Sequence, residues 1–293
     1  MASSPGIAPV RRFRDVVELE KQSPKSPGLC RTHGVRGGMK IWLHRAWMTL
    51  RLSRSVCSPW KVAGQHWSSQ SVTDVTLRCG FDLCAAPEDS LVVMLLEVMN
   101  DRCYTRLLPR DADGVVIDAG ANIGVAAIGF LLHSPHLTVH TYEPHPKVRE
   151  RLTANLNRSG EMARIRIFEE ALSAKEGEAW LSARGQSMDS RLAGPISGSG
   201  LAVRTLGLDQ VLARAEGRRI ALLKLDIEGA EAPALESVGA DAFSKVDRCA
   251  IEYHDDILPA SRERCERRLR EFGLRVWESP LGPGRGYLYG TRD

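Results

Sequence analysis

An apolar run that ends in an aspartate and then breaks into two glycines, VVIDAGANIG, spans residues 115–124. A strand that leads through such a turn into a helix places backbone N–H groups at the start of that helix. Gly120 would let the chain turn and let a ligand approach closely, and Gly124 would permit close packing of the helix on the strand. Asp118 stands where a diphosphate would sit and disfavours that anion, but it suits a ligand that carries ammonium and sulfonium charges. S-adenosylmethionine (SAM) is such a ligand.

The next strand-like run, VHTYEP, ends in Glu143, which follows Gly124 by 19 residues. An acid at this place can accept hydrogen bonds from both hydroxyls of an adenosine ribose. Glu143 therefore supports an adenosine ligand, but it does not separate SAM from NAD.

A third strand-like run, LLKLDIEGAE over residues 222–231, carries ionisable residues at alternate positions. Lys224, Asp226 and Glu228 fall at a period of two and so begin on one face of the strand. Burying three unpaired charges would be costly. They must therefore either pair with one another or face the crevice at the carboxyl end of the strand, where ligands of parallel sheets bind. Lys224 is the member that best suits a purely structural role.

These residues belong to a chain that alternates between strand-like and helix-like runs. We expect strands at residues 114–120, 137–144, 164–172, 220–229, 248–255, 274–280 and 285–291. We expect helices at residues 87–101, 123–134, 146–160, 208–217, 230–239 and 260–273. Residues 72–85 are typical of a hairpin with Gly80 near its turn, and residues 177–184 and 201–206 of an added hairpin or edge pieces. The alternation predicts an α/β fold with a doubly wound, mostly parallel sheet, whose last two strands pair as a hairpin.

The composition is that of a globular chain: 293 residues, 43% apolar and 26% charged. The net charge of +4 is uneven, since residues 1–61 hold 12 Lys and Arg against 3 Asp and Glu. The rest of the chain is mildly acidic, which excludes a basic nucleic-acid-binding body. The seven cysteines form no CxxC pair or zinc spacing, which indicates reduced thiols and a cytoplasmic protein. We find no apolar run of about 20 residues and no signal-peptide core.

The amino-terminal part divides into two segments before the main domain at residues 72–293. Residues 1–38 are rich in Pro, Ser, Gly and Arg and are expected to be a disordered basic extension. Residues 39–71 are expected to be an amphipathic helical and linker segment. Its first part, MKIWLHRAWMTLRL at residues 39–52, fits a helix docked on the body by its tryptophans, and also a weak peripheral contact with an anionic membrane.

Several of these segments together resemble the FkbM-type SAM-dependent methyltransferases: VVIDAGANIG, YEPHP, EEALSAKEGEAWL, RTLGLDQVL, LLKLDIEGAE and AIEYHD, in that order and spacing. The resemblance covers about residues 72–290, and DIEGAE is its most specific element. It implies a class I methyltransferase fold, a Rossmann-like sheet of seven strands with helices on both faces. It also implies methylation of hydroxyl groups on sugars or natural products such as polyketides. Residues 1–71 match nothing in that pattern, and the segment GQSMDSRLAGPISGSG is individual to this chain.

The resemblance also implies roles for single residues. The glycine turn would hold the methionine end of SAM, Glu143 the ribose, and Glu170 with Ala171 would lie beside the adenine. Asp226 would close the methionine side. The expected cofactor-binding residues are Asp118, Gly120, Ala121, Asn122, Gly124, Glu143, Pro144, Glu170, Ala171 and Asp226.

A general base would assist transfer to a hydroxyl, although orientation of the reactants contributes more to the rate. Asp226 and Glu228 end one strand and Glu252 and His254 end the next, so all four are candidates. We favour His254, because the ordinary pKa of imidazole suits neutral pH. A hard cation such as Mg²⁺ is a less favoured alternative, with oxygen ligands from Asp226, Glu228, Glu252, Asp255 and Asp256. We assign no metal ligand, since acidic clusters at loop mouths are usually solvated.

Two other functions stay open at this point. A nucleotide-dependent oxidoreductase is disfavoured, because the middle glycine of the G-x-G-x-x-G pattern is absent from the turn. A non-catalytic methyltransferase-like module would bind SAM or lipid without turning over any hydroxyl acceptor.

Overall fold

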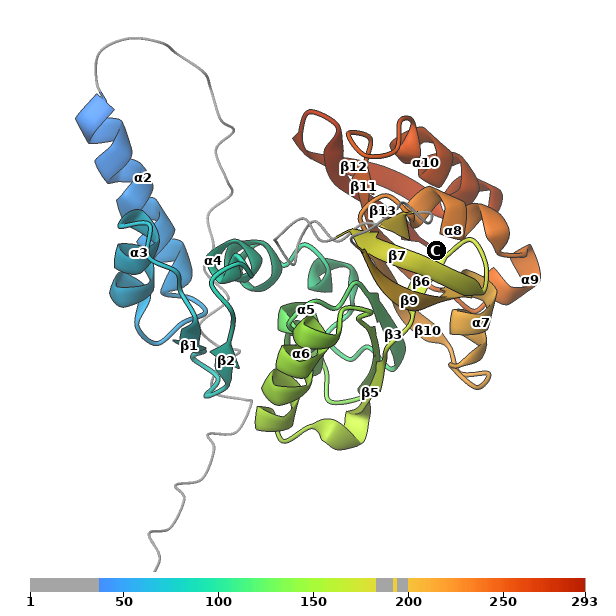
Figure 1. Ribbon diagram of the computed structural model, residues 1–293, viewed down its shortest axis with the longest axis horizontal. Coiled ribbons are helices and arrows are strands. Elements are labelled where there is room, and N and C mark those ends of the chain that lie inside the picture. Colours follow the sequence, from blue (N-terminus) through green and yellow to red (C-terminus); the bar gives the residue numbers. More distant parts are fainter. Residues whose placement is uncertain (1–36, 183–191, 194–199, 293) are drawn as a thin grey trace, which may run out of the picture.

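The computed structural model describes residues 37–182, 192–193 and 200–292. Its main sheet has seven strands in the order β12-β13-β11-β10-β3-β4-β5 (Figure 1). Their bounds are β3 Gly114–Ala119, β4 Leu137–Tyr142, β5 Ile165–Phe168, β10 Ile220–Leu225, β11 Arg248–His254, β12 Arg275–Gly282 and β13 Arg285–Thr291. β3, β4, β5, β10 and β11 run parallel, and β13 is antiparallel to both β11 and β12. The predicted doubly wound, mostly parallel sheet with a terminal hairpin is confirmed.

The strand order reverses between β3 and β10. From β3 the chain proceeds outward to β4 and β5, and then returns to β10 and β11 on the other side of β3. A ligand crevice forms at such a switch point, outside the carboxyl ends of the strands. β3 and β10 are buried along their whole length, as expected for central parallel strands.

Helices cover both faces of this sheet (Figure 1). The bounds are α5 Val125–His133, α6 Pro146–Arg158, α7 Leu208–Ala213, α8 Glu231–Ser237, α9 Ala240–Phe243 and α10 Ser261–Glu271, with short 3₁₀ turns at Thr105–Leu107 and Met162–Arg164. Val116 of β3 packs in one apolar core with α5 and α6, while its neighbours Val115 and Ile117 pack in the other core with α7, α8 and α10. Successive side chains of one strand point to opposite faces of the sheet, so β3 contributes residues to both cores.

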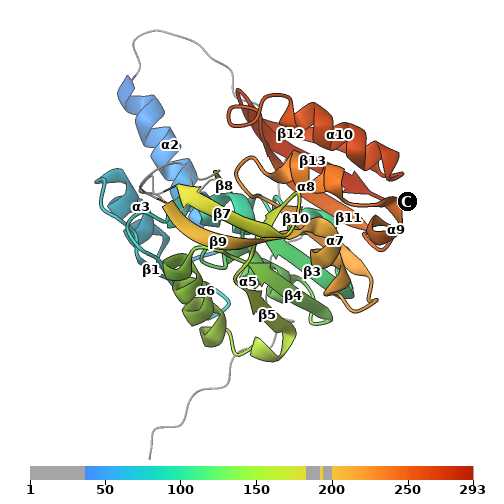
Figure 2. The same cartoon turned by 45° about the vertical axis from the view of Figure 1, so that its right-hand side comes forward.

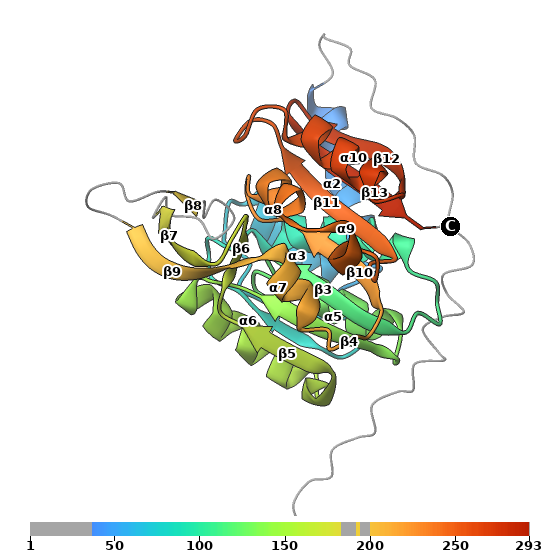
Figure 3. The same cartoon turned by 90° about the vertical axis from the view of Figure 1, so that its right-hand side faces the viewer.

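A second sheet differs from the prediction at residues 164–172. One strand was expected there, but β5 ends at Phe168 and the chain re-enters as β6 (Ala171–Ser173) in a four-stranded sheet of order β6-β9-β7-β8. β7 (Gly177–Ser182) and β9 (Gly200–Gly207) form the predicted hairpin, with β8 (Leu192–Ala193) beside β7. Glu170 lies in this break, and its carboxylate pairs with Arg214 at 2.8 Å. Figure 3 shows β7 and β9 projecting from the main sheet.

The amino-terminal elements pack on the same side as α5 and α6 (Figure 2). They are α2 (Gly37–Leu52), α3 (Pro59–Trp67), the hairpin of β1 (Asp74–Thr76) and β2 (Asp82–Cys84), and α4 (Leu91–Met94), which continues as a π turn, η2, over Leu95–Asn100. Of the extension predicted over residues 1–38, residues 1–36 lie outside the described residues, and Gly37 and Gly38 belong to α2. α2 docks through Met48 and Leu52, whereas Trp47 is about half exposed, so the expected docking through tryptophans is only partly right. Membrane contact stays a prediction; within the described residues, every helix is too short or too polar to span a bilayer.

Candidate active site

A cavity of about 310 Å³ lies at the carboxyl ends of β3, β4, β10 and β11. Most of the predicted residues line it: Gly120, Ala121, Asn122, Glu143, Pro144, Glu170, Ala171, Asp226, Glu228 and Glu252. Asp118, Gly124 and His254 do not. The switch point of the sheet therefore carries the cavity that the sequence predicted, with three residues in roles other than the expected ones.

The glycine turn forms the floor of the cavity. Gly120 has a φ of +74°, and a Cβ on it would lie 1.8 Å from the carbonyl oxygen of Asp226. Gly124 has a φ of +92°, and a Cβ there would meet Leu152 of α6 at 2.8 Å. Gly120 is thus needed where the turn after β3 crosses the loop after β10, and Gly124 where this turn packs against α6. Gly124 acts through packing and does not touch the cavity.

Glu143 is held by backbone donors on both oxygens. The N–H of Asn122 donates to Oε2 at 3.0 Å, and the N–H of His145 donates to Oε1 at 2.9 Å. Burial raises the pKa of Glu143 to about 7 against the lowering effect of these two bonds. Because a carboxylate offers about four lone-pair positions, each oxygen keeps one for a ligand hydroxyl. The side chain is therefore preorganised to accept two hydrogen bonds from the cavity.

The sequence left open whether the charged residues at positions 224–228 pair with other charges or face the crevice. Lys224 pairs with other charges. Its Nζ lies 3.0 Å from Oδ1 of the fully buried Asp118, and it donates to the carbonyl oxygen of Gly120 at 2.7 Å. The two residues face each other across paired strands in register. Burial lowers the pKa of Lys224, but the carboxylates of Asp118 and Asp226 outweigh it and the pKa is raised. Lys224 is therefore a charged structural residue that fastens the glycine turn to β10.

This pairing corrects the role predicted for Asp118. Its charge is balanced by Lys224, and it lies behind the cavity wall, so it cannot contact a ligand directly. The acidity of the cavity comes instead from the carboxyl groups that line it: Glu97, Asp226, Glu228 and Glu252. Burial raises the pKa of Glu97 to about 7 and that of Glu252 to about 8. For both residues, repulsion from the Asp226 carboxylate is the second cause. A cationic ligand would relieve this crowding of acids.

The acidic residues that follow β10 lie in two places: Asp226 and Glu228 line the cavity, and Glu231 is buried in the interior. Asp226 accepts a hydrogen bond from the Tyr104 hydroxyl at 3.2 Å, and Glu228 has a φ of +51°. Glu231 is fully buried and accepts from the N–H groups of Ile227 and Gly229, at 3.1 Å each. The last acid of DIEGAE therefore stabilises the loop, while the first two line the cavity.

Comparison with known proteins identifies the family. The model of the methyltransferase FkbM domain matches residues 118–275, more than half of the chain. The chain is an FkbM-family methyltransferase. It is 29% identical to 31-O-demethyl-FK506 methyltransferase FkbM of Streptomyces tacrolimicus, over 54% of this chain and 73% of that protein. It is 28% identical to the hexuronic acid methyltransferase AglP of Haloferax volcanii, over 56% of this chain and 66% of that protein.

Two further similarities differ in how much of each chain they cover. AmbE, the AMB antimetabolite synthetase of Pseudomonas aeruginosa, is 26% identical over 66% of this chain, which spans only 11% of the length of AmbE. A crystal structure of methyltransferase FkbM from Methylobacillus flagellatus is 15% identical, with a TM-score of 0.46, over 68% of this chain and 53% of that one.

The cavity wall at Glu170 is held from outside by Arg214. Its guanidinium pairs with both oxygens of Glu170, at 2.8 and 3.1 Å, and stacks over the Phe168 ring at 4.5 Å from the centroid. The Arg214 hydrogen bonds lower the pKa of Glu170. Glu170 thus lines the cavity where the resemblance expected it, but its carboxylate is already engaged and only its remaining lone pairs face a ligand.

His254 is the candidate base that the structure does not support. It is fully buried and lies behind Glu228, with Nε2 3.6 Å from Oε2 of that residue and Nδ1 3.1 Å from Oε1 of Glu231. Burial alone would lower the pKa of His254. The carboxylates of Glu231 and Glu228 outweigh this effect and raise the pKa to about 9. A protonated, buried imidazole cannot accept a proton from an acceptor at neutral pH.

Three cavity residues were missed by the sequence reasoning. Glu97 comes from the π turn after α4, Tyr104 from the following loop, and Arg285 from the start of β13. Arg285 is paired with Asp256 at 2.9 Å, which removes that acid from the predicted oxygen cluster. Neither Glu97 nor Tyr104 belongs to a motif or a spacing pattern, so no signal in the sequence marks them.

Proposed function

We propose that this methyltransferase uses SAM to methylate a hydroxyl group of a small metabolite, such as a sugar or a natural product. The observation that carries the proposal is the pairing of two features in one cavity. A buried carboxylate, Glu143, is set by two N–H groups to accept from two hydroxyls, and a cluster of acids lines the same cavity from the loop after β10 and from β11. The first feature suits a ribose and the second a positively charged tail.

The shape and charge of the cavity support SAM over a dinucleotide. Its volume, about 310 Å³, lies at the low end of the roughly 300–1,000 Å³ range of small-molecule sites. The family assignment also removes the oxidoreductase alternative.

The relatives support a hydroxyl acceptor. Their names specify a 31-O position for FkbM, a hexuronic acid for AglP and a 2-O position for NoeI of Sinorhizobium fredii, which is 27% identical over half of this chain.

The mechanism follows from what the chain can hold and move. SAM, when bound, supplies a methyl group bonded to a positively charged sulfur. Glu143 would hold the ribose, and Asp226, fixed by Tyr104 and Lys224, the ammonium end. Such positioning contributes about 7–11 kcal/mol to barrier reduction. Glu252 lines the cavity beside Asp226, and a cation bound there would favour its charged form. In that form Glu252 would take the hydroxyl proton, for a gain of about 10²–10⁴-fold.

Calorimetric titration with SAM and with NAD⁺ tests the proposal directly. We expect SAM to bind and NAD⁺ not to bind. Glu143→Gln should weaken SAM binding by about 10–100-fold, since a hydrogen bond to a charged group contributes about 1.5–3 kcal/mol. Glu169→Gln is the matched control, because Glu169 is next to the cavity in sequence but is exposed and paired with Arg149. Binding of NAD⁺ without SAM would reject the proposal.

Turnover is tested with SAM labelled on its methyl group and a panel of hydroxylated sugars and polyketides. Transfer of label to an acceptor oxygen would support an enzyme. SAM binding without transfer to any acceptor, including water-soluble uronic acids and macrocycles, would favour the non-catalytic module instead.

A further inference from the structure

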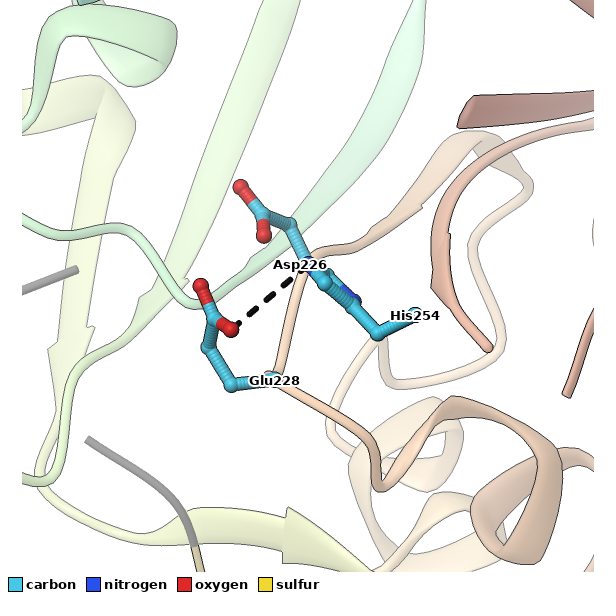
Figure 4. A group of neighbouring side chains, drawn as sticks. All are labelled: Asp226, Glu228 and His254. Atoms are coloured by element: carbon cyan, nitrogen blue, oxygen red, sulfur yellow. Dashed lines mark ion pairs between the residues drawn. The ribbon is translucent and has the colours of Figure 1, made fainter. Parts of the chain in front are cut away.

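Three side chains from two neighbouring loops point toward one another on the acidic side of the cavity. Asp226 and Glu228 follow β10, and His254 ends β11 (Figure 4). One donor atom from each lies within 4.8 Å of the other two. Two carboxylates and an imidazole from adjacent strand ends form a set of ligands that divalent metals accept.

The imidazole of His254 provides an independent sign of a ligand. Its Nε2 is buried, faces Glu228, and has no hydrogen-bond partner among the described residues. The nearest acceptor, Oε2 of Glu228, is 3.6 Å away, which is too far for a hydrogen bond. Oε2 of Glu228 is likewise buried and without a partner. A proton on Nε2 leaves both atoms without a hydrogen bond, whereas a divalent cation that displaces this proton would contact both.

The other ring nitrogen of His254, Nδ1, contacts a buried carboxylate that sets the orientation of the ring. Nδ1 lies 3.1 Å from Oε1 of Glu231, which is itself fixed by the N–H groups of Ile227 and Gly229. A ligating histidine usually donates its second N–H to a carboxylate, which sets the ring orientation and directs the free lone pair at the metal. Glu231 supplies that carboxylate here. This explains why DIEGAE buries its last acid under the loop.

We propose that Asp226, Glu228 and His254 bind one divalent metal ion of the Mn²⁺ type, which holds the acceptor hydroxyl beside the methyl donor. The role in catalysis rests on the proposed function, whereas the binding of the metal does not. This set differs from the oxygen-only cluster expected from the sequence. Asp256 is paired with Arg285, and Asp255 accepts from the N–H of Arg262 at 2.8 Å.

The distances require only a small adjustment. Donors about 2.1 Å from a metal are about 3.0–4.2 Å apart, depending on the angle between them. The separation of 3.6 Å between His254 and Glu228 falls in this range, and the widest separation, within 4.8 Å, needs a modest inward rotation of a side chain. Oε1 of Glu252, 3.9 Å from Nε2 of His254, is in reach as a fourth donor or as the base for a metal-bound hydroxyl.

The metal alone is the probe for the first test. Mn²⁺ is titrated into the full chain, and free Mn²⁺ is followed by electron paramagnetic resonance. We expect one tight site per chain, and a loss of affinity of at least about 100-fold in Glu228→Gln, a ligand to which the proposed function gives no part in SAM binding. Glu228 is partly exposed, so its variant should fold normally, and thermal unfolding checks this. Equal Mn²⁺ binding by wild type and Glu228→Gln, or no tight site in wild type, would overturn the proposal.

The control variant separates this proposal from the function proposed above. Glu143→Gln, at the other end of the cavity, should lose SAM affinity and keep the Mn²⁺ site. Glu228→Gln should show the opposite pattern. Loss of both ligands in either variant would show that the two sites are not separate and would overturn the metal assignment. A chain that binds Mn²⁺ but not SAM would leave the metal site standing and reject the SAM proposal.

Discussion

The contact between Gly120 and Asp226 allows a sharp test of how the two loops hold the cavity. In Gly120→Ala, the new Cβ would lie 1.8 Å from the Asp226 carbonyl oxygen, where ordinary contacts begin at 3.4 Å. One loop must therefore retreat by about 1.6 Å, carrying either the glycine turn or Asp226 away from a ligand. The backbone at this position also has a φ of +74°, which an alanine adopts at a cost.

Gly160→Ala provides the matched control. Gly160 has nearly the same φ, +71°, but a Cβ there meets nothing within 4 Å. It should lose only the cost of the left-handed conformation, about 1 kcal/mol, or about 2–4 °C in Tm. Gly120→Ala should lose that amount plus the cost of displacing a buried loop, about 3 kcal/mol or more in all, and about 100-fold in SAM affinity.

Thermal unfolding and calorimetric titration with SAM measure both quantities on the same samples. The reasoning is refuted if the two alanine variants show the same Tm and the same SAM affinity. That result would mean that the close crossing of the loops makes no demand on the residue at position 120.

Three other predictions concern the remaining walls of the cavity. Burial raises the pKa of Glu143 from 4.5 to about 7, so the folded chain keeps a proton that the unfolded chain releases; the unfolding free energy should fall as pH rises across that window, and Tm measured against pH should be flatter in Glu143→Gln. Tyr104→Phe removes the hydrogen bond to Asp226 and should weaken SAM binding by about tenfold in calorimetry, whereas an unchanged affinity would contradict the positioning role. Arg214→Lys keeps the charge but loses the two-pronged contact with Glu170, and should lower Tm by about 2–4 °C; an unaltered Tm would show that this contact is dispensable.

The sheet and most of the cavity wall were predictable because both depend on local patterns. The alternation of apolar strands and amphipathic helices determines the layers, and strand-end residues such as Gly120, Glu143 and Asp226 must meet at one edge of a parallel sheet. The break after Phe168 was not predictable from periodicity, since RIRIFEEAL is continuous in composition. The break shows only in the pairing of β5 and β6 with different sheets, and the contact at this break joins Glu170 to Arg214, 44 residues away.

The charges inside the site were harder to predict, because they depend on pairing between elements. Asp118 and Lys224 each sit within an apolar run, and only the register of β3 against β10 shows that they neutralise each other. His254 has a suitable ordinary pKa, but its surroundings change it. Tyr104 reaches Asp226 across 122 positions of sequence from a loop without a motif. Such long-range contacts are set by packing, which a single sequence does not reveal.

The small sheet has a consequence for how enzymes of this kind diversify. Leu181 of β7 lines the cavity, while the turn after β3 and the acids after β4 and β10 come from the main sheet. β7 and β9 are inserted between the third and fourth strands of the parallel core, so their connection can change in length and chemistry without altering the order of the core strands. Related enzymes could thus change their acceptor and keep the same methyl donor.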